Sequence, residues 1–167
     1  YAPGLDGAYV RSWPDFEISR RMGGRSGLVR LMRAAHRMGY RIMPYMNITL
    51  CNKQSSVYES LRKYRARVPN GEFLVRSWDW DRDGAVDMWP TIYLNPGHAG
   101  YRKFLVKHVA GLIDEFGFDG IFMDQTCVFH NDPTADNVEG MAEFFEAMHE
   151  RYPEVLCAGE GQGDYLA

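Results

Sequence analysis

Two carboxylic acids stand where they could act together on one substrate. Asp124 follows the apolar segment 120–123, and Glu160 lies just beyond the apolar segment 155–158. Neighbouring parallel strands lie about 4.8 Å apart, so strands at these segments could hold two carboxyl groups about 5–5.5 Å apart. A retaining glycosidase uses this separation: one carboxylate attacks the anomeric carbon and one carboxylic acid protonates the leaving oxygen. Two like charges at short range also raise one pKa and keep that acid protonated near neutrality.

Each of these acids also has a structural interpretation. Asp124 could cap the turn that follows its strand, as Asp often does. Glu160 stands between Gly159 and Gly161 and could belong to a flexible loop. The two acids together favour catalysis more than either does alone.

Aromatic and polar residues near the predicted strand ends could bind a sugar. Such sites need flat apolar surfaces for the faces of pyranose rings and polar groups for their hydroxyls. We expect the substrate-binding residues to be Arg11, Trp13, Asn47, Gln125, Trp78, Trp80 and His130, with Trp89 and Tyr93 as further aromatic candidates. The tryptophans could instead pack a long insert against the rest of the domain, because Trp is usually largely buried. For His130 we favour a solvated loop residue over a substrate contact.

Four short apolar segments are the predicted strands that position these residues: 7–10, 41–46, 120–123 and 155–158. Their nearly continuous apolar character is typical of strands buried on both faces of a parallel sheet. Pro44 is unfavourable in a central strand, because proline cannot donate a hydrogen bond to the ladder. Apolar residues recur at helical spacing over 28–38, 101–116 and 138–148, and these three segments are predicted to be helices.

The order of the elements is β-α-β, a long insert, then α-β-α-β, which implies an α/β fold with a parallel sheet. Segments 4–11 and 117–124 repeat one pattern, a Gly-x-Asp-Gly turn followed by an apolar strand and a charged residue. Repeated βα units are typical of a (β/α)8 TIM barrel, which takes about 250 residues. We therefore expect residues 1–167 to form about half of one barrel domain. The missing strands would come from sequence beyond these residues or from another chain. An open doubly wound sheet is the alternative.

The insert, residues 48–95, carries a motif with two interpretations. Asp79, Asp81, Asp83 and Gly84 match the D-x-D-x-D-G start of a calcium-binding loop, but Pro90 replaces the bidentate Glu of position twelve. The alternative is a β-hairpin with arms at 73–75 and 91–93 and a turn at Asp83-Gly84. We favour the hairpin, because the missing Glu is the strongest ligand of a calcium loop.

The segment 95–125 contains the most specific pattern. It reads Asn-Pro-Gly at 95–97, YRKFL at 101–105 and FGFDGIFMDQ at 116–125. This block resembles the strand-four region of TIM-barrel glycoside hydrolases of the α-amylase, α-galactosidase and α-glucosidase groups. The stretch GRSGLVRLMRAAHRMGYRIMPYMN at 24–47 is similar to their preceding helix and third strand. LCAGE at 156–160 is similar to the strand that delivers the acid/base Glu of amylase-like enzymes. The resemblance implies that Asp124 is the nucleophile and Glu160 the general acid/base.

Two positions depart from the amylase pattern. Amylases carry an Arg two residues before the nucleophile, where this chain has Phe122, and an Asn-His pair at the end of strand three, where it has Asn47-Ile48. The third carboxylate of the amylase site would lie on a later strand. These departures indicate a divergent glycosidase rather than an amylase.

Composition restricts the partners. Residues 1–70 carry thirteen Lys and Arg against four Asp and Glu, whereas residues 71–167 carry six against eighteen. We expect these halves to attract each other rather than nucleic acid, because no aromatic platform is interleaved with the basic residues. No apolar run approaches the roughly 18–20 residues of a membrane-spanning helix. Three cysteines are too few and too scattered for a disulfide scaffold or a zinc module.

We therefore predict a glycoside hydrolase of the retaining kind that acts on a carbohydrate without a metal or other cofactor. The main alternative is a non-catalytic carbohydrate-binding barrel that keeps the aromatic platforms. A metal-dependent hydrolase with Asp124 and Glu160 as ligands is disfavoured, because no predicted strand ends in a cluster of His. An isolated half-barrel leaves two open sheet edges, so we expect these residues alone to self-associate and to be inactive.

Overall fold

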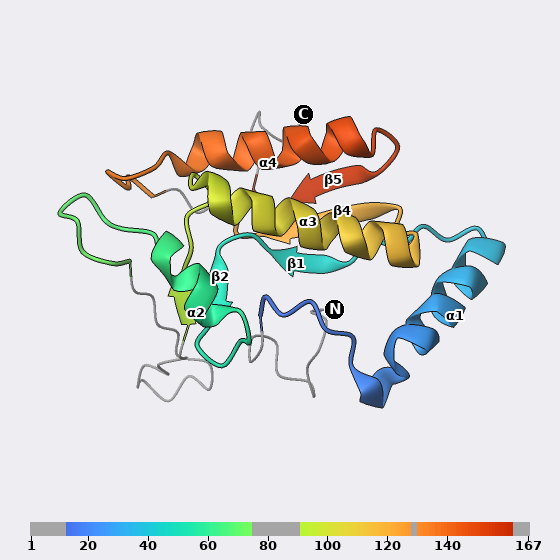
Figure 1. Cartoon of the computed structure of the whole chain (residues 1–167). Coiled ribbons are helices and arrows are strands. Elements are labelled where there is room, and N and C mark those ends of the chain that lie inside the picture. Colours follow the sequence, from blue (N-terminus) through green and yellow to red (C-terminus); the bar gives the residue numbers. More distant parts are fainter. Residues whose placement is uncertain (1–12, 75–90, 128–129, 162–167) are drawn as a thin grey trace, which may run out of the picture.

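The computed structural model describes residues 13–74, 91–127 and 130–161. In chain order the elements are η1 (Arg20–Met22), α1 (Gly24–Arg37), β1 (Tyr45–Asn47), β2 (Leu50–Asn52), α2 (Tyr58–Leu61), η2 (Arg62–Tyr64), β3 (Thr91–Tyr93), α3 (Ala99–Phe116), β4 (Gly120–Asp124), α4 (Asn137–Arg151) and β5 (Leu156–Gly159). Figure 1 shows α3 and α4 lying alongside each other next to the sheet of β1, β4 and β5, with α1 set apart at one end.

Three parallel strands form the main sheet in the order β1-β4-β5. The central strand β4 pairs Asp124 with Asn47 on one side and Met123 with Gly159 on the other. Three of the predicted strands are therefore confirmed, and the segment 7–10 lies outside the described residues. β1 is shorter than predicted and begins after Pro44. Proline has no N–H to donate, so Pro44 contributes only its carbonyl, which accepts a hydrogen bond from Phe122 N at 3.0 Å.

The three predicted helices are confirmed, and local signals set their ends. α4 begins after Asp136, whose Oδ1 accepts hydrogen bonds from the backbone N–H groups of Val138 and Glu139 at 2.9 and 3.1 Å. α3 ends at Gly117, which has the left-handed φ of 70° that glycine adopts without strain. Gly117 thus ends α3 three residues before β4 begins.

The core lies between the main sheet and the helices α3 and α4. It includes the fully buried side chains Leu105 and Val109 of α3, Met141 and Phe144 of α4, and Ile121 and Met123 of β4. α4 also lies directly against the backbone that precedes α3. A Cβ on Gly140 would lie 2.3 Å from Gly97 N and 2.4 Å from Pro96 C, so only glycine allows this approach.

The strand pairing in the insert between β1 and α3 differs from the predicted hairpin. β3 pairs antiparallel with β2, which places Ile92 opposite Cys51, and not with Phe73 or Leu74 of the predicted arm. On the other side of β3, Ala66 N donates to Tyr93 O at 2.9 Å. The reason lies directly after β1, where Asn47 Oδ1 accepts the N–H groups of residues 49 and 50, both at 2.8 Å. This tight turn places β2, rather than a later segment, beside β3.

Phe73 forms an isolated antiparallel bridge with Arg67 instead. The proposed turn at Asp83-Gly84 and the remainder of the calcium-like motif lie outside the described residues. The calcium interpretation therefore stays a prediction, as do the bounds of the insert.

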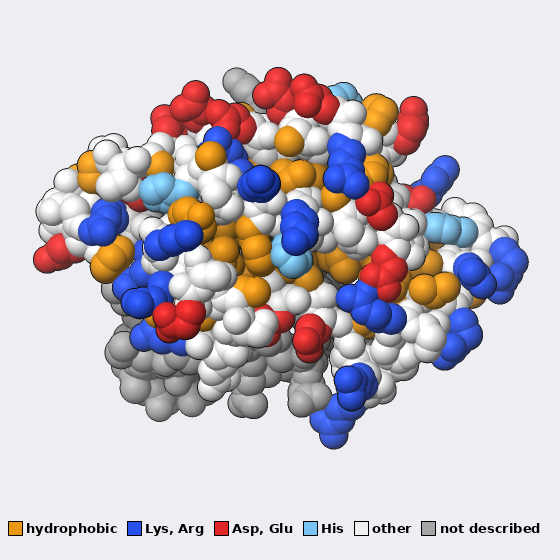
Figure 2. Space-filling model, in the orientation of Figure 1, with side chains coloured by type: hydrophobic (Ala, Val, Ile, Leu, Met, Phe, Trp, Pro, Cys, Tyr) orange, Lys and Arg blue, Asp and Glu red, His pale blue; other side chains and the backbone are white. Residues whose placement is uncertain are grey.

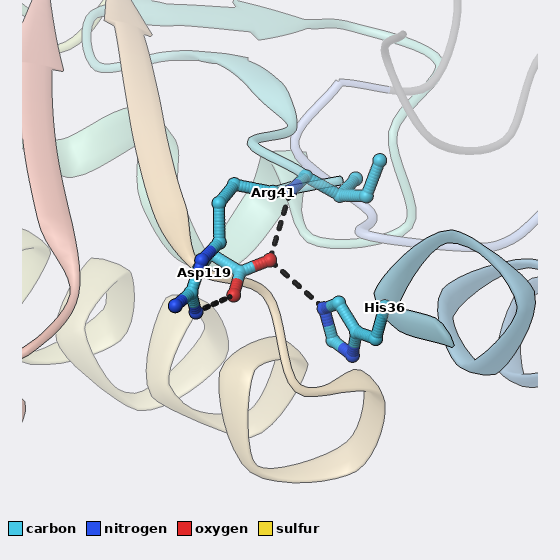
Figure 3. Close-up of polar contacts among 4 residues, drawn as sticks. His36, Arg41 and Asp119 are labelled. Atoms are coloured by element: carbon cyan, nitrogen blue, oxygen red, sulfur yellow. Dashed lines mark hydrogen bonds and ion pairs between the residues drawn. The ribbon is translucent and has the colours of Figure 1, made fainter. Parts of the chain in front are cut away.

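The Asp119 carboxylate, directly before β4, joins that strand to α1 and to the segment that leads into β1. Asp119 accepts hydrogen bonds from Arg41 Nη1 at 2.8 Å and from Ile42 N at 2.8 Å, and it pairs with His36 Nε2 at 2.9 Å (Figure 3). Burial raises the pKa of Asp119, but these hydrogen bonds outweigh it and lower the pKa to about 2. Asp119 therefore stabilises the fold at the end of the sheet opposite Asp124.

Charged side chains are segregated on the surface. Figure 2 shows acidic side chains over α4 and basic side chains over α1. Ion pairs of Arg25 with Glu115 and of Arg41 with Asp119 join the basic and acidic halves of the sequence. None of the described helices is long and apolar enough to cross a membrane.

Candidate active site

Three polar side chains meet where the parallel strands end. Asn47 is the last residue of β1, Asp124 the last of β4, and Glu160 follows β5 directly. Residues 47 and 124 are paired in register, and Glu160 N donates to Met123 O at 3.1 Å, which extends the β4–β5 ladder by one bond. The carboxyl ends of parallel strands are where α/β folds place their ligand sites.

The two acids lie close enough for Asp124 to change the pKa of Glu160. Hydrogen bonding with the Asp124 carboxyl group is the largest cause that raises this pKa. Backbone N–H donation from Gln125 lowers that pKa, while burial and the charge of Asp124 raise it further. The raised pKa favours the protonated form of Glu160, as expected for an acid beside another carboxyl group.

Asp124 is the fixed member of the pair. Its residue is 6% exposed, and its Oδ2 accepts a hydrogen bond from Asn47 Nδ2 at 2.9 Å. Asn47 is itself held by the turn after β1, because its Oδ1 accepts two backbone N–H groups. Glu160, by contrast, is an exposed residue. One acid is thus held by the strand ends, while the other faces solvent.

Two glycines place the backbone of Glu160 against the loop after β4. A Cβ on Gly159 would lie 2.4 Å from Thr126 Oγ1, and a Cβ on Gly161 would lie 2.3 Å from Cys127 Cβ. Gly161 N also donates to Thr126 Oγ1 at 3.2 Å. The backbone on both sides of Glu160 is therefore packed closely, which argues against a flexible loop acid.

Gln125 and Cys127 contact Glu160 directly, and Thr49 contacts Gln125. Gln125 N donates to Glu160 Oε2 at 3.0 Å, and Gln125 Oε1 accepts from Thr49 Oγ1 at 2.6 Å. Cys127 Sγ lies 3.9 Å from Glu160 Oε2 and donates a weak hydrogen bond to it. Sequence reasoning did not single out Thr49. Its only signal was its place two residues after the strand-end Asn47, where a hydroxyl can reach the neighbouring strand end.

The remaining predicted substrate-binding residues are placed as follows. Trp13 is 4% exposed and packs on Phe16 with ring centroids 4.9 Å apart, which suits a packing residue rather than an open platform. His130 is half-buried, and its ring lies edge-to-face with that of Tyr93, with the ring centroids 5.6 Å apart. Burial lowers the pKa of His130. Arg11, Trp78, Trp80 and Trp89 lie outside the described residues.

The loop that carries His130 is tied to the insert by a second buried acid. Asp132 Oδ2 accepts hydrogen bonds from Arg67 N at 2.8 Å and from Asn95 Nδ2 at 3.0 Å, and Thr134 donates to Oδ1. Burial raises the pKa of Asp132, but these four donors lower it overall. Asp132 therefore stabilises this loop as a carboxylate, and its lowered pKa does not suit a proton donor. In the part of the chain described by the structure, no group of three or more His, Cys, Asp or Glu is arranged to hold a metal ion.

By its fold, the chain is an α/β domain like those of glycoside hydrolases. Its structure is similar to the α-galactosidase from Lactobacillus brevis (TM-score 0.67, 17% identity, 96% of this chain and 22% of that one). It is also similar to an α-amylase from Lactobacillus plantarum (0.64, 18%, 89% and 31%) and to the maltogenic amylase from S. marinus (0.69, 14%, 95% and 27%). The chain thus spans roughly a fifth to a third of each of these proteins.

The chain belongs to the family described as a domain of unknown function, DUF6259, whose model matches residues 6–165. No curated protein matches it. The resemblance to glycoside hydrolases expected from the sequence is therefore supported at the level of the fold.

Proposed function

We propose that this chain carries the acid pair of a retaining glycoside hydrolase, with Asp124 as nucleophile and Glu160 as general acid/base. The position of these two carboxyl groups at the ends of adjacent parallel strands, where Asp124 raises the pKa of Glu160, is the observation that supports this function most. In a retaining mechanism the nucleophile forms a covalent glycosyl-enzyme intermediate, which water then hydrolyses with help from the second acid. The domain would be part of a (β/α)8 barrel whose other strands complete the sugar site.

The assignment of the two roles follows from how each acid is held. A nucleophile must stay in place, and Asp124 is buried and bonded to Asn47 Nδ2. A general acid/base must gain and lose a proton in each catalytic cycle, which suits the exposed Glu160 with its raised pKa. A sugar that enters the site would lie between the two acids, and the exposed side chain of Glu160 could turn aside while its backbone stays in place.

Variants of the two acids test this proposal in the complete protein with a panel of aryl glycosides. The panel includes α-galactosides and α-glucosides, because the structurally similar proteins are named as α-galactosidases and amylases. Asp124→Asn should abolish turnover of every substrate. Glu160→Gln should lower turnover by about 10²–10⁴-fold with a poor leaving group. The loss in the first step, formation of the glycosyl-enzyme, should be much smaller with a dinitrophenyl leaving group, which needs no proton, whereas hydrolysis of the intermediate should stay slow.

Asp114→Asn is the matched control, because Asp114 lies on the outer helix α3 and pairs with Arg151. It should keep full activity. Turnover that survives in Asp124→Asn would exclude Asp124 as nucleophile. A parent protein that binds sugars but hydrolyses none of the panel would instead favour a non-catalytic carbohydrate-binding domain.

A further inference from the structure

A strained residue separates the proposed nucleophile from the rest of its loop. Gln125 has a φ of 61°, in the left-handed region. For residues other than glycine this conformation is unfavourable and persists where the surroundings enforce it. Among the described residues, Phe16 is the only other non-glycine residue with positive φ. Some contact of Gln125 must therefore hold it in this conformation.

Thr49 supplies such a contact. Its hydroxyl donates to Gln125 Oε1 at 2.6 Å, while the alternative acceptor, Asn47 Oδ1, is farther away at 3.3 Å. Thr49 is completely buried, and its backbone is fixed at both ends: its N–H donates to Asn47 Oδ1, and its carbonyl accepts from Leu94 N at 2.6 Å. A hydroxyl held this firmly can fix the side chain that it contacts.

The backbone of Gln125 carries this constraint to Glu160. In its left-handed conformation Gln125 directs its N–H to Glu160 Oε2 at 3.0 Å. A chain of contacts thus runs from the turn after β1, through Thr49 and Gln125, to the exposed acid after β5. This chain does not pass through Asp124, although Asn47 contacts both Thr49 and Asp124.

We propose that Thr49 is a positioning residue, whose buried hydroxyl holds Gln125 in the conformation that aims its N–H at Glu160. The inference rests on the proposed function for its catalytic meaning, because Glu160 is the general acid/base there. It gives Gln125 a positioning role in place of the substrate contact expected from the sequence, since Thr49 occupies its amide oxygen.

The groups around Glu160 determine how the loss of the Thr49–Gln125 hydrogen bond changes its pKa. Asp124 from β4 raises the pKa of Glu160, whereas the Gln125 N–H and the Cys127 thiol, both from the loop after β4, lower it. Removal of the Thr49 hydroxyl leaves the effect of Asp124 in place and weakens one of the two opposing contacts. The titration of Glu160 should therefore move to higher pH.

The test compares Thr49→Val, which removes the hydroxyl at similar size, with Thr49→Ser, which retains it. Carboxyl ¹³C NMR of the complete protein follows the titration of Glu160, and the resonance is assigned by its absence in Glu160→Gln. We expect the Glu160 midpoint of Thr49→Val to lie above the parental one and that of Thr49→Ser to match it. On a glycoside that the parent hydrolyses, Thr49→Val should lower kcat about tenfold, with little change in KM.

Gln125→Met removes the acceptor from the other side and carries the test if Thr49→Val does not fold. It should raise the midpoint as Thr49→Val does, and the double variant should raise it no further. An unchanged midpoint in a folded Thr49→Val or Gln125→Met protein would overturn the proposal. The NMR titration needs no substrate, so it separates this result from a failure of the glycosidase proposal, which would show only as absent turnover.

Discussion

Asp119→Asn should destabilise the fold in a pH-dependent manner. The pKa of Asp119 is lowered from 3.8 to about 2, and each pKa unit corresponds to about 1.4 kcal/mol. The side chain of Asp119 is only 14% exposed, but its partner Arg41 is 86% exposed and His36 39% exposed. Solvent screening of these partners reduces the expected loss to about 1–2 kcal/mol at pH 7.

The sign of the pH dependence follows from the lowered pKa. A carboxyl group whose pKa is lower in the folded state stabilises that state above its unfolded pKa, and this contribution disappears as the pH falls. The difference between the parent and Asp119→Asn should therefore be constant above about pH 5 and should shrink as the pH falls from about 4 to 2.

Urea unfolding, followed by circular dichroism at several pH values, measures this difference. Asp114→Asn is the control, because Asp114 also accepts from an arginine at 2.9 Å but is 53% exposed. Its ion pair should contribute less than about 1 kcal/mol. An Asp119→Asn loss that is the same at pH 3 as at pH 7 would refute the electrostatic reasoning, as would a loss no larger than that of the control.

Two other substitutions give opposite expectations for stability. Gly140→Ala should lower the free energy of unfolding in urea by about 1–3 kcal/mol, because the new Cβ meets the backbone of residues 96 and 97 at 2.3–2.4 Å. In Gly111→Ala the new Cβ meets no atom within 4 Å, so this variant should be more stable by about 0.5–1 kcal/mol. Equal effects of the two variants would contradict the packing of α4 on residues 96 and 97. Glu160→Gln should raise Tm at pH 7 and leave it nearly unchanged at pH 3. The raised pKa of Glu160 means that its ionisation opposes folding once the pH exceeds its unfolded value; a lower Tm at pH 7 would show that the charge of Glu160 is favourable instead.

Much of the main sheet and its helices could be predicted from the sequence because their signals are local. Gly117 and Asp136 mark helix ends by their own backbone and side-chain chemistry, and the predicted end of α3 and start of α4 lie within one residue of the observed ones. The placement of Asp124 and Glu160 at one edge of the sheet was also accessible, because both acids follow neighbouring parallel strands whose ends must share that edge. The pattern of apolar segments was enough to bring these two residues together.

Features that depend on long-range contacts were not accessible in the same way. The partner of β3 is decided by the turn at Asn47, some forty residues earlier, and not by the Asp-Gly pair that suggested a hairpin. Trp13 could have been a platform or a packing residue, and only the position of Phe16 decides between them. Thr49 had no pattern of its own, because the role proposed for it depends on the backbone conformation of Gln125, which follows β4 far away in the sequence.

Covalent trapping tests the central claim most directly. The complete Glu160→Gln protein, incubated with a 2-deoxy-2-fluoro glycoside of the preferred sugar that carries a dinitrophenyl group, should accumulate a glycosyl ester, and peptide mass spectrometry should locate it on Asp124. An ester on any other residue would contradict the assignment of the nucleophile. Turnover without an ester and with inversion at the anomeric carbon would contradict the retaining mechanism itself.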